Sequence, residues 1–141
     1  GETKGKFKMM EANIRMNSIV KKAINYAFNK HKNQSRKISG VPYITHPMAV
    51  AGIIAEVTRD EEIISAAILH DIIEDCGISH EELKKEFGER IANIVLQLTK
   101  PQNKSMIKSR EALMIKCADV LHNISDGEEW YIKKKLKDIW S

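Results

Sequence analysis

The segment Ile63–Gly77 reads I-I-S-A-A-I-L-H-D-I-I-E-D-C-G and contains the most abrupt change from apolar to polar residues in the chain. An almost continuous apolar run ends at His70-Asp71, and a second polar pair, Glu74-Asp75, follows two residues later. Residues three and four apart are neighbours on a helix. The segment therefore predicts one helix whose edge carries an imidazole and three carboxylates, and which ends at a Cys76-Gly77 C-cap.

This concentration of acids is unfavourable without a partner. The carboxylates repel one another, and the negative end of the helix dipole disfavours each by ~0.3–1 kcal/mol if it is exposed. Burial would strengthen the repulsion. A divalent cation removes the difficulty, and a His-Asp pair offers natural ligands for it. The alternative is a solvated acidic helix end beside a histidine that packs in the core. The apolar run before His70 favours the cation, because it places the pair at the rim of a core.

Composition sets the outer bounds. A chain of 141 residues that is 43% hydrophobic is long enough for one domain with a sizeable core. Two cysteines, Cys76 and Cys117, do not make a disulfide framework, so we expect a cytoplasmic protein. The sequence offers no membrane-spanning run and no signal peptide, and we expect no membrane partner. The net charge of +4 fits a polyanionic ligand.

Apolar residues recur at helical spacing along the chain, and no strand pattern or repeat is visible. The fold class is therefore all-α. We expect helices at about Glu11–Asn33, from an N-cap at Thr45 through Val57, from an N-cap at Ser79, after Gly88, and over Asp126–Ser141. A further long helix should bury a stripe formed by Leu113, Cys117, Val120 or Leu121, and Ile124. Pro101–Ser105 reads as a turn.

Other polar residues gain meaning from their positions. His46 should lie at a helix start, and Asp119, between Ala118 and Val120, needs a partner if it is buried. We expect His31 to pack or cap, and we assign no role to His80. Arg36 and Lys37 lie in a loop rich in Gly, Pro and Ser, where such a pair is ordinarily solvated surface but can also reach a ligand.

Six strings in one unbroken order resemble the HD-domain alarmone hydrolases, which are the hydrolase halves of RelA/SpoT enzymes and the stand-alone small alarmone hydrolases. They are H-x-x-Q-x-R-K (31–37), G-x-P-Y-I-T-H-P (40–47), A-A-I-L-H-D-I-I-E-D (66–75), F-G-E-R (87–90), L-T (98–99) and K-C-A-D-V-L-H-N (116–123). The resemblance implies a helical HD-domain bundle with a metal site at the rim of the core. We expect a single such domain over residues 1–141, with residues 1–10 outside its ordered part and with fewer C-terminal helices than its relatives.

The resemblance also implies roles by position. One Mn²⁺ ion would be held by His46, His70, Asp71 and Asp119. The catalytic dyad that acts on the attacking water would be Glu74 and Asp75, and the substrate side would comprise Arg36, Lys37 and Asn123. The implied activity is removal of the 3′-pyrophosphate from guanosine tetra- or pentaphosphate. The partner would be that small-molecule nucleotide; we expect no nucleic acid, and the oligomeric state stays open.

The residues suit this chemistry. Two imidazoles and two carboxylates favour Mn, Fe or Zn over Ca, and a carboxylate pair nearby can transfer protons. The guanidinium fork of Arg36 suits phosphate. The chain departs from the family in a short stretch between Thr99 and Asp119, and in Val120 and Ser125, where basic residues are usual. Two alternatives follow: an HD phosphohydrolase of another nucleotide, and a non-catalytic nucleotide-binding module.

Overall fold

The computed structural model describes residues 18–37, 39–99, 107–126, 133–134 and 136–137, and within them the chain is helical. The one β feature of this described part is an isolated antiparallel bridge between Ser35 and Pro42. The helices are α2 (Ser18–His31), α3 (Thr45–Val57), α4 (Glu61–Ile68), α5 (Ile72–Cys76), α6 (His80–Phe87), α7 (Glu89–Gln97) and α8 (Arg110–Ser125). The predicted all-α class is confirmed. None of the described helices is long and apolar enough to cross a membrane.

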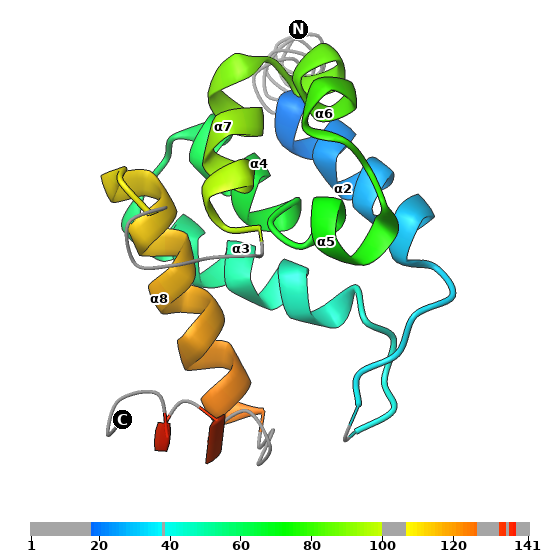
Figure 1. The fold of residues 1–141 in the computed structure, drawn as a ribbon, viewed down its shortest axis with the longest axis vertical. Coiled ribbons are helices and arrows are strands. Elements are labelled where there is room, and N and C mark those ends of the chain that lie inside the picture. Colours follow the sequence, from blue (N-terminus) through cyan, green and yellow to red (C-terminus); the bar gives the residue numbers. More distant parts are fainter. Residues whose placement is uncertain (1–17, 38, 100–106, 127–132, 135, 138–141) are drawn as a thin grey trace, which may run out of the picture.

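The core forms around α4. This short helix packs against α2, α3 and α7, and α8 closes the bundle by packing on α3 and α7 (Figure 1). Ala66, Ala67 and Ile68 of α4 are fully or almost fully buried. Asp60 caps the N-terminus of α4 by accepting hydrogen bonds from the backbone N–H groups of Glu62 and Ile63. The apolar run of the central segment is therefore the middle of the bundle.

Several local predictions are confirmed. Ser79 accepts a hydrogen bond from the Glu82 N–H and starts α6. Gly77 has φ of 67°, a left-handed conformation that favours glycine, and ends α5. The helix expected after Gly88 is α7, and its apolar residues Ile91, Ile94 and Val95 are buried. These features depend on neighbouring residues, so the sequence was sufficient to predict them.

The central segment is not one helix, contrary to the sequence prediction. The helix stops at Ile68, turns through Leu69–Asp71, and resumes as α5. The carbonyl of Ala67 would accept the Asp71 N–H in a continuous helix, but it lies 2.7 Å from Nδ1 of the His70 ring. The same carbonyl accepts the backbone N–H of His70 at 3.4 Å, and His70 and Asp71 lie in a turn.

Two other predictions are wrong in detail. Thr45 is not the N-cap of α3: the cap position is Ile44, and the Thr45 hydroxyl donates to the carbonyl of Pro42 at 2.8 Å. The buried stripe of α8 is also shifted around the helix. Leu113, predicted to be buried, is 54% exposed, and Leu121, predicted as an alternative to Val120, is 56% exposed.

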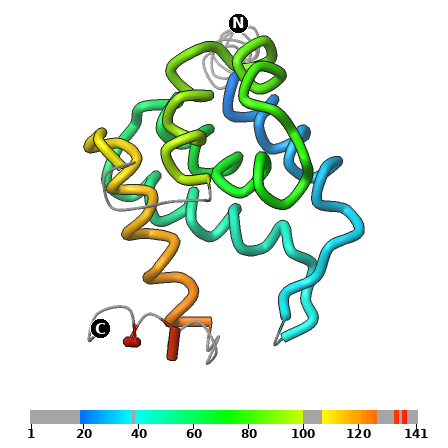
Figure 2. The backbone as a smooth tube through the Cα atoms, viewed as in Figure 1, coloured from blue at the N-terminus to red at the C-terminus, as the bar shows by residue number. Residues whose placement is uncertain are grey.

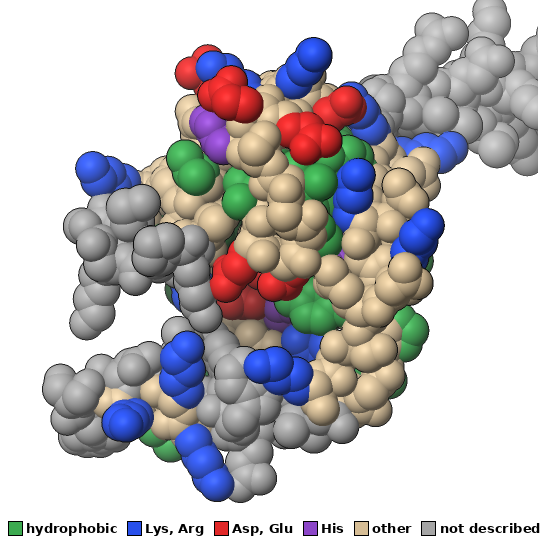
Figure 3. All heavy atoms as spheres, turned by 45° about the vertical axis from the view of Figure 1, so that its right-hand side comes forward, with side chains coloured by type: hydrophobic (Ala, Val, Ile, Leu, Met, Phe, Trp, Pro, Cys, Tyr) green, Lys and Arg blue, Asp and Glu red, His purple; other side chains and the backbone are tan. Residues whose placement is uncertain are grey.

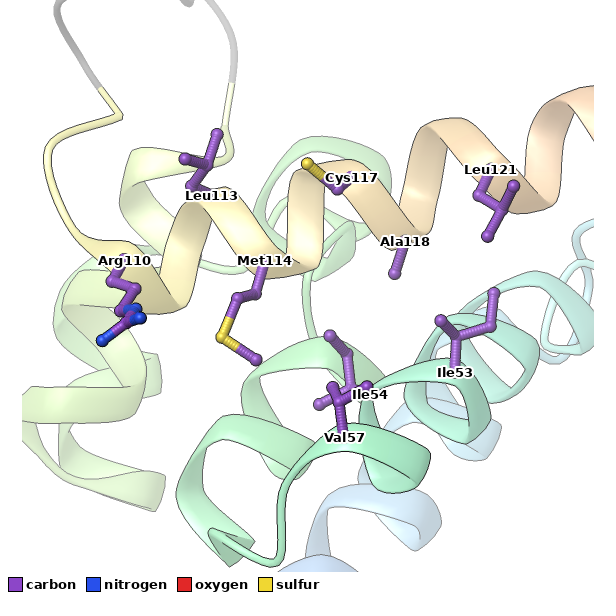
Figure 4. A pocket seen from close by; sticks show the side chains of 9 residues that line it. All are labelled: Ile53, Ile54, Val57, Arg110, Leu113, Met114, Cys117, Ala118 and Leu121. Carbon is purple, nitrogen blue, oxygen red and sulfur yellow. The ribbon is translucent and has the colours of Figure 1, made fainter.

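The residues of α8 that enter the core are Ala112, Ile115 and Ala118. Alanines allow close helix packing, and this rotation of α8 turns Asp119 inwards. The larger apolar side chains instead border a pocket of about 400 Å³ between α3 and α8. In Figure 4, Leu121 points from α8 towards Ile53 of α3. This pocket has no acidic or histidine side chain in its lining, so it is not the predicted metal site.

The predicted N-terminal helix is described from Ser18 onwards and ends at His31, and the earlier residues lie outside the described part. The predicted turn at residues 101–105 and most of the predicted helix over residues 126–141 also lie outside it. Residues 133–134 and 136–137 of that segment are helical. The loop between α2 and α3 projects from the bundle as a narrow hairpin (Figure 2).

Candidate metal centre

Four side chains distant in sequence converge at the rim of the core. His46 comes from the first turn of α3, His70 and Asp71 from the turn between α4 and α5, and Asp119 from α8. One potential ligand atom from each lies within 4.8 Å of the others. These are the four predicted ligands, and the fold brings all of them together.

The cluster is held by contacts between its own members. His46 Nε2 lies 2.7 Å from Asp119 Oδ1. His70 Nε2 lies 3.0 Å from Asp71 Oδ2 and 3.3 Å from Asp119 Oδ1. Both histidines are buried. Two imidazole nitrogens and two carboxylate oxygens pointing to one place form a donor set that suits a divalent transition metal.

The acids and His70 change one another's pKa. Burial opposes every charge here, but Asp71 and Asp119 raise the pKa of His70 well above its ordinary value. In turn, although burial acts to raise it, hydrogen bonds from His46 and His70 hold the pKa of Asp119 far below its usual range. Burial also acts to raise the pKa of Asp71, but the charge of His70 outweighs it and lowers that pKa. The carboxylates are therefore ionised, and positive charge at this point is strongly favoured.

The orientation of His70 is set by the backbone. Its Nδ1 lies 2.7 Å from the carbonyl oxygen of Ala67. A carbonyl can only accept a hydrogen bond, so Nδ1 carries a proton and donates it. Nε2 is left facing the two carboxylates, where it could bind an ion.

Tyr43 supports Asp71. Its hydroxyl donates to Asp71 Oδ2 at 2.6 Å, and burial together with the nearby charges of Asp71 and Asp75 raises the pKa of Tyr43. The phenol therefore stays a neutral donor. Sequence reasoning gave Tyr43 no role, although its place three residues before His46 within P-Y-I-T-H-P was a usable indication.

His122 was also missed. Its Nδ1 lies 2.7 Å from Nδ1 of His46, and the centroids of the two rings are 5.0 Å apart. Burial and the adjacent His46 lower the pKa of His122, so its neutral form is favoured. An indication was available in the sequence, because His122 lies three residues after Asp119 and therefore on the same face of a helix.

The predicted substrate-side residues adjoin the cluster. Nη2 of Arg36 donates to Asn123 Oδ1 at 2.9 Å, and Asn123 Nδ2 donates to Asp119 Oδ1 at 3.3 Å. Nε and Nη2 of Arg36 donate to Asp126 Oδ2 at 3.2 and 3.1 Å. Arg36 is only 8% exposed, so it is not the solvated surface residue that its loop alone suggested. Lys37, the next residue, is exposed.

The predicted dyad lies on α5, just beyond Asp71. Glu74 and Asp75 are both exposed. Partial burial of its carboxyl group and the charge of Asp71 raise the pKa of Asp75. Gln34 ties this helix to the end of α2, because its Nε2 donates to the Asp75 carbonyl at 3.1 Å while its Oε1 lies 2.8 Å from His31 Nδ1. His31 is buried, as expected of a residue that packs, and it lies outside the ligand cluster.

A space-filling view shows what the site presents to solvent. Acidic, histidine and basic side chains meet in a recess on one face of the molecule (Figure 3). Glu74 and Asp75 of α5 are exposed, while the candidate ligand histidines are buried. A polar ligand can therefore approach the cluster from the side of the dyad.

Comparison with known proteins identifies this arrangement. A family model for the HD domain matches residues 23–113. The guanosine-3′,5′-bis(diphosphate) 3′-pyrophosphohydrolase MESH1 of Danio rerio is 37% identical over 132 residues, covering 81% of this chain and 72% of that protein. MESH1 of Xenopus tropicalis is 32% identical over 139 residues, covering 88% and 75%. A solved structure of a metazoan SpoT orthologue that hydrolyses ppGpp has a TM-score of 0.66 at 33% identity, covering 74% of this chain and 67% of that one.

Much longer proteins match as well. The chain is 39% identical over 123 residues to a probable GTP pyrophosphokinase of Mycobacterium leprae but spans only 16% of its length.

The match to the HD domain model and the similarity to the MESH1 proteins show that the chain belongs to the HD domain family, among the MESH1-like small alarmone hydrolases. The fold and the ligand cluster agree with that membership.

Proposed function

We propose that this protein is a metal-dependent 3′-pyrophosphohydrolase of guanosine tetra- and pentaphosphate. The observation that carries the proposal is the convergence of His46, His70, Asp71 and Asp119 within 4.8 Å, beside an acidic pair and an arginine. The similarity to MESH1 proteins, which bear this activity in their names, supports it independently.

The four clustered residues would hold one divalent ion, and Mn²⁺ is the ion that the resemblance implies. The donor set fits, because its two carboxylates are ionised and its two imidazoles each direct Nε2 into the cluster. When bound there, such an ion lowers the pKa of water and polarises phosphoryl oxygens. Tyr43 would hold Asp71 in place, since its hydroxyl donates to Oδ2 of that residue.

Glu74 and Asp75 would move the protons. In the hydrolysis, a water oxygen forms a bond to the phosphorus attached to the ribose 3′ oxygen, and the bond from that phosphorus to the 3′ oxygen breaks. The water gives up a proton and the 3′ oxygen gains one. A carboxylate beside the cluster can accept the first proton, and a carboxyl group with a raised pKa can supply the second. We assign these steps to the pair without dividing them between its members.

Arg36, Asn123 and Lys37 would face the nucleotide. The Arg36 fork is held beside the cluster by Asn123 and Asp126, at the place where a substrate pyrophosphate would lie. Because its contacts with Asp126 are to a carboxylate, a phosphate group can replace that carboxylate with similar geometry. Lys37 is exposed on the same loop, further along the chain, and would contact the base or a more distant phosphate.

One assay tests the activity. The purified protein is incubated with Mn²⁺ and, separately, with guanosine 3′,5′-bis(diphosphate), its pentaphosphate form, the adenosine counterpart and GTP, and the products are separated by anion exchange. We expect guanosine diphosphate and pyrophosphate from the first substrate, and loss of turnover when Mn²⁺ is chelated. Asp119→Asn serves as the inactive control. Turnover of another nucleotide alone would replace the proposed substrate, and binding without turnover would indicate a nucleotide-binding module.

A further inference from the structure

The His46 ring makes a close contact at each of its nitrogens. Nε2 lies 2.7 Å from Asp119 Oδ1, and Nδ1 lies 2.7 Å from Nδ1 of His122. His46 is only 1% exposed, so water does not provide an alternative partner for the ring. The planes of the His46 and His122 rings are inclined to each other by 28°. His122 is not one of the four residues of the candidate ligand cluster.

The chemistry of imidazole indicates which of the two rings donates the hydrogen bond and which accepts it. A histidine that binds a metal through Nε2 must offer a lone pair there, so its Nδ1 carries the proton and needs an acceptor. At His46 the atom in place to accept is Nδ1 of His122. Building on the metal site of the proposed function, we propose that His122 is a positioning residue: it accepts the Nδ1 proton of His46 and thereby aims His46 Nε2 at the ion.

The arrangement makes α8 a support as well as a source of a ligand. Asp119 and His122 are three residues apart on α8, and α8 packs against α3, which carries His46. One helix therefore provides a ligand and orients another. The other ligand histidine, His70, has a different support, because its Nδ1 donates to a backbone carbonyl that no substitution can remove. Of these two histidines, only His46 is oriented by a side chain, and that side chain can be changed by substitution.

Three substitutions separate hydrogen bonding from packing. His122→Asn places an amide oxygen close to where Nδ1 lies and so keeps the acceptor. His122→Leu fills a similar volume but has no acceptor. His122→Gln keeps an amide but carries it one bond further from the backbone, nearer the position of Nε2. If the acceptor at Nδ1 is what matters, Asn should behave like the natural protein, and Leu and Gln should not.

The measurement is the affinity for Mn²⁺ by isothermal titration calorimetry at fixed pH. Removing the hydrogen-bond partner of a metal-ligating histidine typically weakens binding by ~10–100-fold. We expect a loss in that range for His122→Leu and His122→Gln, and an affinity within about threefold of the natural protein for His122→Asn. Circular dichroism and thermal unfolding without added metal show whether each variant is folded. If the leucine variant does not fold, the comparison between Asn and Gln, which are both polar amides, still decides the matter.

His80 provides a matched control. Its Nε2 lies 2.8 Å from Asn93 Oδ1, so it also makes a side-chain hydrogen bond, but it is on α6 and outside the cluster. His80→Leu should leave the Mn²⁺ affinity unchanged. A loss there equal to that of His122→Leu would show that the effect is not specific to the site and would overturn the proposal.

The outcomes distinguish this inference from the function on which it rests. Natural affinity in all His122 variants, or an equal loss in all three, would overturn the positioning role and leave the metal site intact. Absence of Mn²⁺ binding by the natural protein would overturn both. Binding that depends on His122 as described, in a protein that hydrolyses none of the nucleotides, would support the inference and overturn the proposed activity.

Discussion

Arg36 and Asp126 are joined by an ion pair with Nη2 and Oδ2 3.1 Å apart, although 90 residues separate them in the sequence. The pair connects the loop between α2 and α3 to the C-terminal end of α8. Asn123, one turn earlier on α8, accepts a further hydrogen bond from the same guanidinium. The loop that would contact the substrate is thus attached to the helix that carries Asp119.

This attachment predicts that Arg36 contributes to stability as well as to substrate binding. Arg36→Ala should lower the free energy of unfolding by ~1–3 kcal/mol, because it removes a buried guanidinium and leaves the side chains of Asp126 and Asn123 without that donor. Urea unfolding measures the change. Lys37→Ala, at the exposed neighbouring position, is the control and should stay within ~0.5 kcal/mol. Equal effects of the two substitutions would contradict the role of the ion pair.

Removing one ligand side chain should abolish the stabilisation of the folded protein by Mn²⁺. A ligand at a hundred times its Kd stabilises the folded state by ~2.7 kcal/mol. We expect Mn²⁺ at that excess to raise the stability of the natural protein by this amount and to have no effect on Asp71→Ala. Glu81→Ala, which removes an exposed carboxylate on α6, should keep the full metal response. Thermal unfolding with and without Mn²⁺ gives the comparison, and undiminished stabilisation of Asp71→Ala would exclude that residue from the site.

Glu74→Gln tests proton transfer apart from metal binding. The amide keeps the size of the side chain but cannot accept a proton, so kcat should fall by ~10²–10⁴-fold while Mn²⁺ affinity is nearly retained. Steady-state kinetics and calorimetry on the same preparation measure both. Glu89→Gln on α7 is the matched control, with unchanged kcat. Loss of Mn²⁺ binding in Glu74→Gln would instead make Glu74 a ligand.

Asp60 gives a pH-dependent contribution away from the site. Burial acts to raise its pKa, but hydrogen bonds from Arg90 and from the N–H groups at the start of α4 outweigh burial and lower it from 3.8. A carboxyl group with a lowered folded-state pKa stabilises the fold above its unfolded-state pKa, and this stabilisation is lost as the pH falls through the folded-state value.

Asp60→Ala should therefore reduce the free energy of unfolding at pH 7 by ~0.5–2 kcal/mol, the usual range for an N-cap. The difference from the natural protein should shrink as the pH is lowered from about 4 towards 2. Urea unfolding at a series of pH values measures it. A difference that does not change over this range would show that the charge of Asp60 is not what stabilises the cap.

The four candidate ligands could be named from the sequence alone. His46, His70, Asp71 and Asp119 stand in linear motifs whose order survives in the chain, and the structure brings all four together. Local features could be predicted from the sequence equally well, because the Ser79 cap and the left-handed conformation of Gly77 depend only on adjacent residues. A prediction of this kind succeeds when the interactions that determine the feature lie within one or two helical turns.

Tertiary structure decided how those residues are presented. Helical periodicity could not show that the central helix would break after Ile68. At the break, the His70 ring contacts both the carbonyl of Ala67 and Asp119 from another helix. Helical periodicity also predicted that the stripe of α8 with the larger apolar side chains would be buried. The packed molecule instead buries Ala112, Ile115 and Ala118, and in this rotation of α8 both Asp119 and His122 contact His46. Contacts between segments dozens of residues apart set that rotation, and no local pattern contains them.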